Sequence, residues 1–145
     1  MSRVYELAVQ LLARREHSTK ELQRKLSQRE FTEQESNDVL NLLQQQGLQS
    51  DDRFTEQYVR MRRNRGYGPM KIQAELRERG IDDELASCWL DASNAAWLDA
   101  AMQAWEKKFG PTVASDFNAL NKQRRFMYYR GHSQSTIAEV EDEYR

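Results

Sequence analysis

The most distinctive chemistry in the sequence is a cluster of arginines in residues 60–72, which read RMRRNRGYGPMKI. Four arginines fall within six residues, and two glycines and a proline follow at once. Guanidinium groups bind phosphates and carboxylates through paired hydrogen bonds, so this cluster suits a polyanion. The glycines lack the GxxxxGK[ST] spacing of a phosphate-binding loop, and no strand is expected before them. We therefore expect an arginine-based binding surface and no nucleotide site.

Basic residues also gather elsewhere along the chain. Residues 50–80 carry eight basic and five acidic residues, and residues 122–130 carry four basic and no acidic ones. The net charge of −1 therefore hides local positive charge and does not exclude a polyanion-binding face, although such runs are often only solvated helix faces. The candidate residues for binding a partner or DNA are Arg60, Arg62, Arg63, Arg65, Tyr67, Lys71, Lys122, Arg124, Arg125, Arg130, Arg14, Arg15, Arg24 and Lys25.

Residue types that support catalysis or metal binding are scarce. One cysteine and two histidines cannot supply the four close ligands of a zinc site. His17 and His132 occupy equivalent places in a repeat described below, which favours a structural role for both. Cys88 lies beside Trp89 on an expected helix, where a buried structural thiol is the default. The carboxylates form no group with a nucleophile and a base. We expect no catalytic residue, no metal ion and no cofactor.

The composition favours a helical protein. The 145 residues include only six glycines and two prolines, and 39% of them are hydrophobic, enough for modest cores. The mean hydropathy is −0.93, no apolar run approaches the roughly 18 residues of a membrane span, and the first residues do not resemble a signal peptide. A single cysteine excludes an internal disulfide and suits a reducing compartment. We expect a soluble cytoplasmic protein.

The arginine cluster belongs to a pattern that occurs three times. Residues 15–22 (REHSTKEL), 65–72 (RGYGPMKI) and 130–137 (RGHSQSTI) share an arginine, a ring, a small residue and an aliphatic residue at matching places. Gly66 and Gly131 suit the left-handed residue after a helix end. Ser18 with Glu21 predicts a capping box, and Pro69 suits a first helical position. Each stretch is therefore expected to form a tight corner between two helices.

Apolar positions at helical spacing extend the repeat on both sides of the corners. They predict an all-α protein of tandem three-helix repeats, each too small to bury much by itself, stacked in an elongated and curved array. We expect a first repeat in residues 1–49, a second in residues 50–94, a linking helix in residues 95–110 and an irregular or truncated third repeat in residues 111–145. No stretch has the alternation of a β-strand.

Two positions depart from the repeat. Glu141 stands where the other repeats have Leu26 and Leu76, which predicts irregularity or fraying near the end of the third repeat. Glu16 stands where the other two corners have glycine, which predicts a different geometry and less positive charge at the first corner. The second and third corners are therefore the stronger binding candidates. Arg65 recurs in all three corners and is expected to serve the corner itself, whereas Arg60, Arg62 and Arg63 are expected to face a partner.

The segments EHSTKELQRKL, LQSDDRFTEQYVRMRRNRGYGPMKIQAELRERGI, KKFG and RRFMYYRGHS resemble the RecX regulatory family of bacteria, and the resemblance covers nearly the whole chain. It is most specific in residues 51–76. It implies tandem three-helix units and binding to RecA filaments on single-stranded DNA, by capping filament growth or by lodging in the filament groove. It also implies that recombination and the SOS response are restrained. We also expect the protein to be a monomer.

Two other functions fit the residues. A helix-turn-helix DNA-binding regulator would place a basic helix in a major groove, but Gln73, Glu75 and Glu78 make the helix after the second corner a poor neighbour for phosphates. An adaptor would bind another helix through exposed aromatics such as Trp97 and Trp105, although their spacing fits better with packing between the second and third repeats. For Tyr67, Tyr128 and Tyr129, stacking on bases is a further hypothesis, although packing at the corner fits Tyr67 better.

Overall fold

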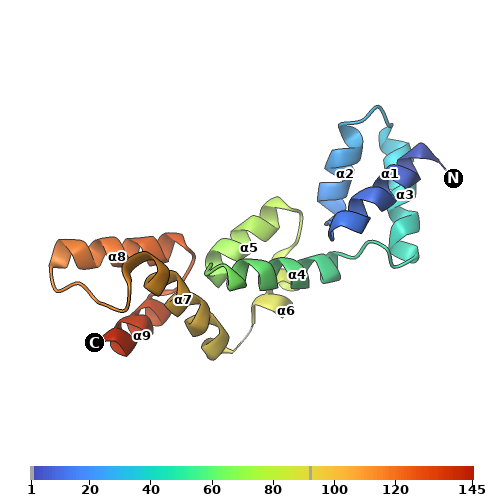
Figure 1. The fold of residues 1–145 in the computed structure, drawn as a ribbon. Coiled ribbons are helices and arrows are strands. Elements are labelled where there is room, and N and C mark those ends of the chain that lie inside the picture. Colours follow the sequence, from blue (N-terminus) through green and yellow to red (C-terminus); the bar gives the residue numbers. More distant parts are fainter. Residues whose placement is uncertain (1, 92) are drawn as a thin grey trace. The chain divides into compact units, whose positions relative to one another are not determined.

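Helices make up all the regular structure in the computed structural model, which describes residues 2–91 and 93–145. The predicted all-α class is therefore confirmed for these residues. None of the described helices has the length and apolar character needed to cross a membrane. Along the chain the helices are α1 (Arg3–Arg14), α2 (Thr19–Ser27), α3 (Glu33–Gln45), α4 (Asp51–Asn64), α5 (Pro69–Glu78), α6 (Asp83–Leu90), α7 (Asn94–Phe109), α8 (Phe117–Tyr129) and α9 (Gln134–Tyr144) (Figure 1).

Side-chain caps start several of the helices. The Ser18 hydroxyl accepts a hydrogen bond from the Glu21 amide and the Glu21 carboxylate accepts one from the Ser18 amide, so the predicted capping box is confirmed. Thr32 and Glu35 form a second capping box at α3. Helix α5 begins at Pro69, as predicted. These caps satisfy amide groups that the first helical turn leaves without a partner.

Glycines in the left-handed region end the helices before the second and third corners. Gly66 has φ +89° and Gly131 has φ +97°, which other residues adopt only with strain. At both ends the residue after the glycine donates to a carbonyl five residues earlier, as in a Schellman motif. The first corner instead has Arg15 at φ −167°, in extended conformation. The different geometry predicted from Glu16 is therefore confirmed.

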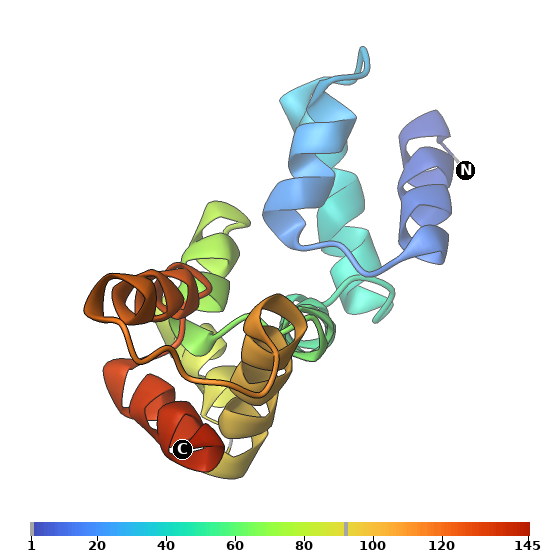
Figure 2. The ribbon, with the colours of Figure 1, turned by 60° about the vertical axis from the view of Figure 1, so that its left-hand side comes forward.

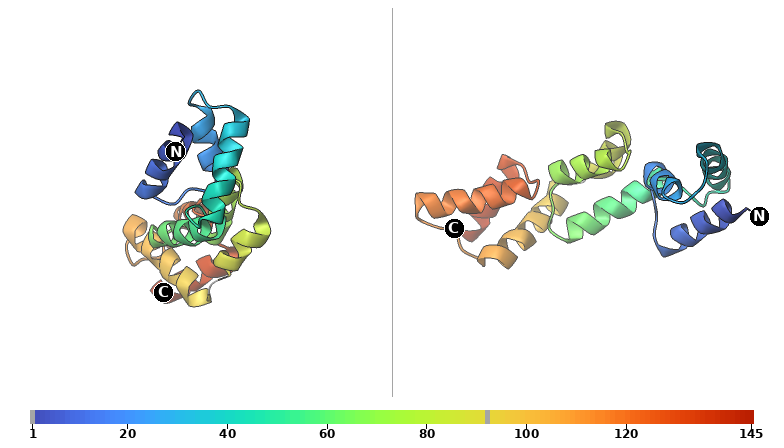
Figure 3. Two further views of the ribbon diagram at one scale, coloured as in Figure 1. Left: turned by 90° about the vertical axis from the view of Figure 1, so that its right-hand side faces the viewer. Right: turned by 90° about the horizontal axis from the view of Figure 1, so that it is seen from above.

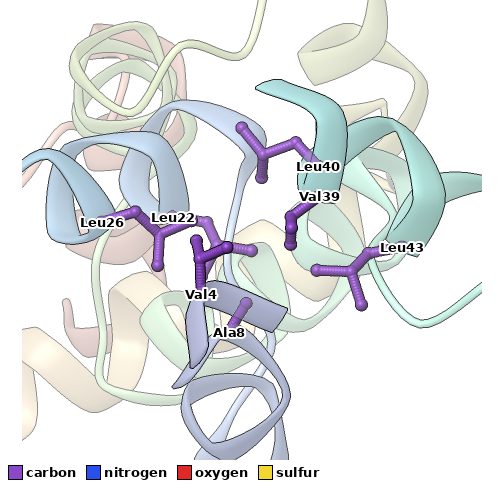
Figure 4. Packing of buried hydrophobic residues seen from close by; sticks show 7 residues of the cluster. All are labelled: Val4, Ala8, Leu22, Leu26, Val39, Leu40 and Leu43. Carbon is purple, nitrogen blue, oxygen red and sulfur yellow. The ribbon is translucent and has the colours of Figure 1, made fainter. Parts of the chain in front are cut away.

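The chain divides into two compact units, an N-terminal unit of residues Met1–Gln57 and Leu76–Ala86 and a C-terminal unit of residues Tyr58–Glu75 and Ser87–Arg145. In the N-terminal unit, α1, α2 and α3 pack against one another (Figure 2). Their apolar side chains point into one shared core (Figure 4) formed by Val4, Ala8, Leu22, Leu26, Val39, Leu40 and Leu43. Burial of these side chains is the main stabilising contribution to this repeat.

In the C-terminal unit, α7 packs against both α8 and α9 (Figure 3). The core between these helices is formed by Ala101, Ala104, Trp105, Met127, Ile137 and Val140. Helix α9 continues through Glu141 to Tyr144, so the chain is not frayed at that point. Helix α7 therefore completes a three-helix bundle with α8 and α9.

The tryptophans of α7 are core residues. Trp97 and Trp105 are 6% and 0% exposed. Their indole N–H groups donate to the carbonyl oxygens of Leu90 and Thr112, at 3.1 and 3.0 Å. The hypothesis that they form an exposed adaptor surface is therefore wrong, because both the rings and their polar atoms are engaged inside the C-terminal unit.

The prediction of a buried thiol at Cys88 is also wrong, since its side chain is exposed. The physical reason is the helical period. Ala86 faces the interior of α6 and is fully buried, and Cys88 lies about 200° further around the helix at about 100° per residue. Cys88 therefore lies on a different face of α6 from the buried Ala86, although it is next to Trp89 in the sequence.

Candidate functional site

The second and third corners lie backbone to backbone inside the C-terminal unit. The Gly68 amide donates to the Arg130 carbonyl at 2.8 Å, and the Met70 amide donates to the Gly131 carbonyl at 3.1 Å. A Cβ atom on Gly68 would lie 2.4 Å from the Gly131 carbonyl group, so a side chain at this position would force the corners apart. This contact explains why the second corner has glycine where the other two have serine, and it brings their arginines together.

His132 links the same two corners from within. Its Nε2 atom lies 2.9 Å from the Gly66 carbonyl oxygen, which fits an N–H that donates to that carbonyl, while the buried Nδ1 atom has no hydrogen-bond partner. Burial lowers the pKa of His132 below its ordinary value of 6.5, and this outweighs the hydrogen bond to Gly66. A neutral, fully buried ring has the structural role expected for this histidine.

A hollow of about 930 Å³ opens beside this junction. We call it the basic hollow, because five of its lining residues are cationic and only one is acidic. Its lining consists of Arg62, Asn64, Arg65, Tyr67, Gln103, Ala104, Glu106, Lys107, Lys108, Phe126 and Arg130. Three segments supply its cations: the end of α4 with the second corner that follows it, the last turn of α7, and the corner after α8.

Arg62 is fixed at the edge of the basic hollow. Its Nε and Nη2 atoms donate to the two oxygens of Glu75 at 2.9 and 2.8 Å, and the Tyr58 hydroxyl donates to the same carboxylate at 3.0 Å. Burial opposes the charge of Arg62, but the hydrogen bonds and charge of Glu75 outweigh it and raise the pKa. The guanidinium also lies 3.8 Å from the centre of the Tyr67 ring. Arg62 is therefore an anchored cation.

Arg65 behaves differently from Arg62. Its side chain is exposed and lines the basic hollow. Among the described residues, neither Arg65 nor Lys107 nor Lys108 forms a salt bridge, so their charges remain available to a ligand. The sequence predicts that Arg62 faces a partner and that Arg65 serves the corner. The structure shows the opposite arrangement, because Glu75 binds Arg62 within the corner and the Arg65 side chain is exposed.

Arg130 completes the hollow from the third corner. Its guanidinium lies 4.4 Å from the centre of the Tyr67 ring and 5.0 Å from that of Phe126. Lys108 lies 5.6 Å from the Phe126 ring. Cation–π contacts of this kind hold positive charge in place without neutralising it. The Tyr67 and Phe126 rings therefore hold Arg130 and Lys108 at the hollow through cation–π contacts.

Arg124 and Arg125 lie away from the basic hollow, at a second hollow of about 530 Å³ between α8 and α9. Arg124 donates to both oxygens of Glu141, with the shortest distance 2.7 Å, and the Glu141 side chain is only 5% exposed. Arg145 contacts the same carboxylate at 3.3 Å. The third repeat thus has the Arg124–Glu141 ion pair at positions where the second repeat has apolar residues. Tyr128 also lines this hollow and is 56% exposed.

The basic residues of the first corner lie in the N-terminal unit, and two of the four candidates, Arg15 and Lys25, have a polar partner there. Arg15 contacts Glu21 at 3.1 Å, and Glu16 accepts from Arg53 at 2.6 Å. The Lys25 ammonium lies 2.9 Å from the His17 ring. Burial and the neighbouring arginine lower the pKa of Lys25. Arg14 and Arg24 are exposed on α1 and α2.

The remaining sequence candidates are scattered over the C-terminal unit. Arg60 and Lys122 are exposed, and Lys71 lies 6.0 Å from the Tyr67 ring. Arg63 lies 5.5 Å from the Trp97 ring. Of the predicted residues, the structure brings together Arg62, Arg65, Tyr67 and Arg130.

Sequence reasoning missed two cations of the hollow, Lys107 and Lys108. They stand in the segment KKFGP, where lysines complement the dipole of a helix that ends at glycine and proline. From the sequence alone the two lysines are explained by their place at a helix end. Only the fold shows that the last turn of α7 faces the second corner.

The fold defines an all-helical protein built from tandem three-helix domains. Three family models match in series, those of the first, second and third three-helix domains of RecX, at residues 5–43, 50–88 and 97–140. The third match begins inside α7. This chain belongs to the RecX family.

Individual relatives agree with the family models. The chain is 39% identical over 143 residues to "Regulatory protein RecX" of Legionella pneumophila (strain Corby), with 97% of this chain and 93% of the relative covered. It is 41% identical over 134 residues to the protein of the same name from Mannheimia succiniciproducens, with 88% and 84% covered. The crystal structure of RecX from Lactobacillus salivarius superimposes with a TM-score of 0.82 at 25% identity, over 98% of this chain and 94% of that one.

Proposed function

We propose that this chain is a regulatory protein that binds RecA recombinase filaments on single-stranded DNA and restrains their growth, their recombinase activity and the SOS response. Membership of a family whose relatives are named regulatory proteins supports the proposal. We further propose that it acts as a monomer in the cytoplasm, where such filaments form, and without a catalytic step. The repeat boundaries at residues 49, 94 and 110 stay a prediction.

The observation that carries the proposal at the level of residues is the basic hollow. Arg65, Lys107 and Lys108 line it without an internal salt bridge among the described residues, and Arg130 is held beside them by aromatic rings. Unpaired charges on a protein surface are poorly explained by stability and suit recognition of an anionic partner. We propose that this surface contacts the filament.

The test is co-sedimentation with RecA assembled on single-stranded DNA, together with inhibition of filament ATPase. The double variant Arg65→Glu/Lys108→Glu should raise the apparent Kd at least about tenfold, because two attractive charges become repulsive. The matched control is Arg3→Glu/Arg29→Glu, which makes the same charge change at exposed positions of the N-terminal unit. Full inhibition by the hollow variant, with helicity intact, would remove the hollow from the proposal.

The alternative function, a helix-turn-helix regulator of duplex DNA, gains little support. The helix after the second corner is α5, which carries Gln73, Glu75 and Glu78, and Glu75 is bound to Arg62. Sequence-specific duplex binding with a Kd of roughly 10⁻⁸ M at physiological salt would favour it over filament binding.

A further inference from the structure

The basic hollow is shaped for one kind of partner. Resting on the proposed function, we propose that the hollow receives a carboxylate-rich segment of the filament protein itself and does not receive the DNA strand. The choice between these partners follows from the rings, the arrangement of the cations and the charge of the molecule.

The aromatic rings at the hollow are already covered. Guanidinium groups of Arg62 and Arg130 lie 3.8 and 4.4 Å from the centre of the Tyr67 ring. Arg130 and Lys108 lie 5.0 and 5.6 Å from that of Phe126, whose edge-to-face partner is Phe109, at 5.4 Å. Surfaces that bind single strands use open aromatic faces on which bases stack. Cations of the protein itself therefore already occupy positions over both rings of the hollow.

The cations form a compact group and not a continuous line of positive charge along the surface. Arg65, Lys107, Lys108 and Arg130 converge on one hollow from three segments. In the same unit, Arg124 is bound to Glu141 and faces another hollow, so it does not extend the group. A groove for a strand needs positive charge along several nucleotides. A compact group of this kind instead matches a few carboxylates close together in a protein sequence.

The charge of the molecule points the same way. The net charge is −1, and the sequence pI of about 6.2 lies well below the values above 9 that are typical of nucleic-acid-binding domains. Glu106 is the acidic residue in the lining of the hollow and accepts a hydrogen bond from the Tyr144 hydroxyl at 3.1 Å. A carboxylate in the lining disfavours a continuous phosphate backbone, whereas a protein segment can place a polar or cationic residue opposite it.

Exposed guanidinium and ammonium groups together suit carboxylates of different geometry. Arg65 can form a planar pair of hydrogen bonds with one carboxylate, as Arg62 does with Glu75. Lys107 and Lys108 act as point charges for a second or third. We therefore assign to the ligand two or three Asp or Glu residues on one short segment.

A photo-crosslinking experiment separates the two partners. Benzoylphenylalanine is placed at Gln103, an exposed and uncharged residue of the hollow, and the full chain is added to RecA filaments on single-stranded DNA. A second probe at Asn64, also uncharged and in the lining, covers the case that the first weakens binding. Co-sedimentation is measured for each probe variant, and a probe at the exposed Gln34 of α3 gives the background.

The expected result is a crosslink from the hollow to the RecA protein, within a peptide rich in Asp and Glu. Changing two acids of that peptide to Lys should restore at least half of the inhibition lost in Arg65→Glu/Lys108→Glu. Crosslinks to DNA, or background crosslinking from both probes while the variants still co-sediment, would overturn the inference and leave the proposed function intact. Failure of the unmodified chain to co-sediment would instead overturn the proposed function.

Discussion

At the residue scale, Gly131 is, like Gly68, a tightly packed position of the junction between the second and third corners. It has φ +97°, and a Cβ atom there would lie 2.5 Å from the backbone nitrogen and the Cβ atom of Lys71. Gly131→Ala should therefore lower the free energy of unfolding by more than about 2 kcal/mol, through strain and a steric clash. Gly47→Ala is the control, since Gly47 has φ +72° and no atom within 4 Å of the added Cβ. Urea unfolding of both variants checks this, and equal losses would contradict a packed junction.

The ion pair of Arg124 and Glu141 takes the place of Val59 and Leu76 in the second repeat, which are 2% and 0% exposed. Arg124→Val alone should destabilise the protein by about 2 kcal/mol, because it leaves the 4%-exposed Glu141 with only Arg145. Only Glu141 of this pair is buried, whereas the Arg124 side chain is 44% exposed. Arg124→Val/Glu141→Leu should return the stability to about the native level, since the buried carboxylate that needs a partner is removed together with it. Denaturation midpoints of the single and double variants form the test. A double variant less stable than Arg124→Val would contradict it.

His132 makes the junction sensitive to pH. Burial holds its pKa below 6.5, so the folded protein binds fewer protons here than the unfolded chain does at slightly acidic pH. Its stabilising contribution is fully present above pH 6.5 and is lost as the pH falls from there towards the folded-state pKa. Stability measured between about pH 7 and pH 5 should fall less steeply in His132→Gln than in the native chain. His17, whose pKa is also lowered, is present in both proteins and provides the common background.

At the scale of elements, two helix caps differ in the hydrogen bonds that their side chains make. The Ser18 hydroxyl accepts from the Glu21 amide and also donates to the Arg79 carbonyl at 2.7 Å, within the N-terminal unit. Thr32 caps α3 with the same box but is exposed. Ser18→Ala should cost about 2–3 kcal/mol and Thr32→Ala about 1 kcal/mol, because only the first also leaves a carbonyl without its donor. Thermal unfolding compares them, and equal shifts in Tm would argue against the second bond.

The caps were predictable because they depend on residues a few positions apart, as with Ser18 and Glu21 or Arg63 and Gly66. Short-range sequence patterns of the same kind predicted the helices. They failed where a helical face had to be chosen, as at Cys88, and where the partner lies far along the chain. Arg62 finds Glu75 only when α4 and α5 fold together, and Lys107 meets the second corner only through the packing of α7.

Part of the candidate site was also predictable. The repeated corners identified Arg65, Tyr67 and Arg130, because a repeated motif places its residues at equivalent positions, and the arginine cluster before the second corner identified Arg62. The sequence pattern predicted these residues as a group. It could not distinguish an arginine bound inside the corner from one left exposed. That distinction depends on whether a carboxylate from another helix lies within hydrogen-bond distance, as Glu75 does for Arg62.

At the scale of the whole molecule, near-neutrality and local positive charge predict how binding responds to salt. The affinity for the filament should fall as the salt concentration rises from about 50 to 300 mM, because the Debye length shortens and the exposed cations of the hollow are screened. Arg65→Glu/Lys108→Glu should flatten this dependence. Arg3→Glu/Arg29→Glu carries the same net charge and should keep it, since the charges that matter are those of the hollow. Co-sedimentation across a salt series for the three proteins measures these slopes. Equal flattening in both variants would mean that total charge governs binding and that the hollow has no special part in it.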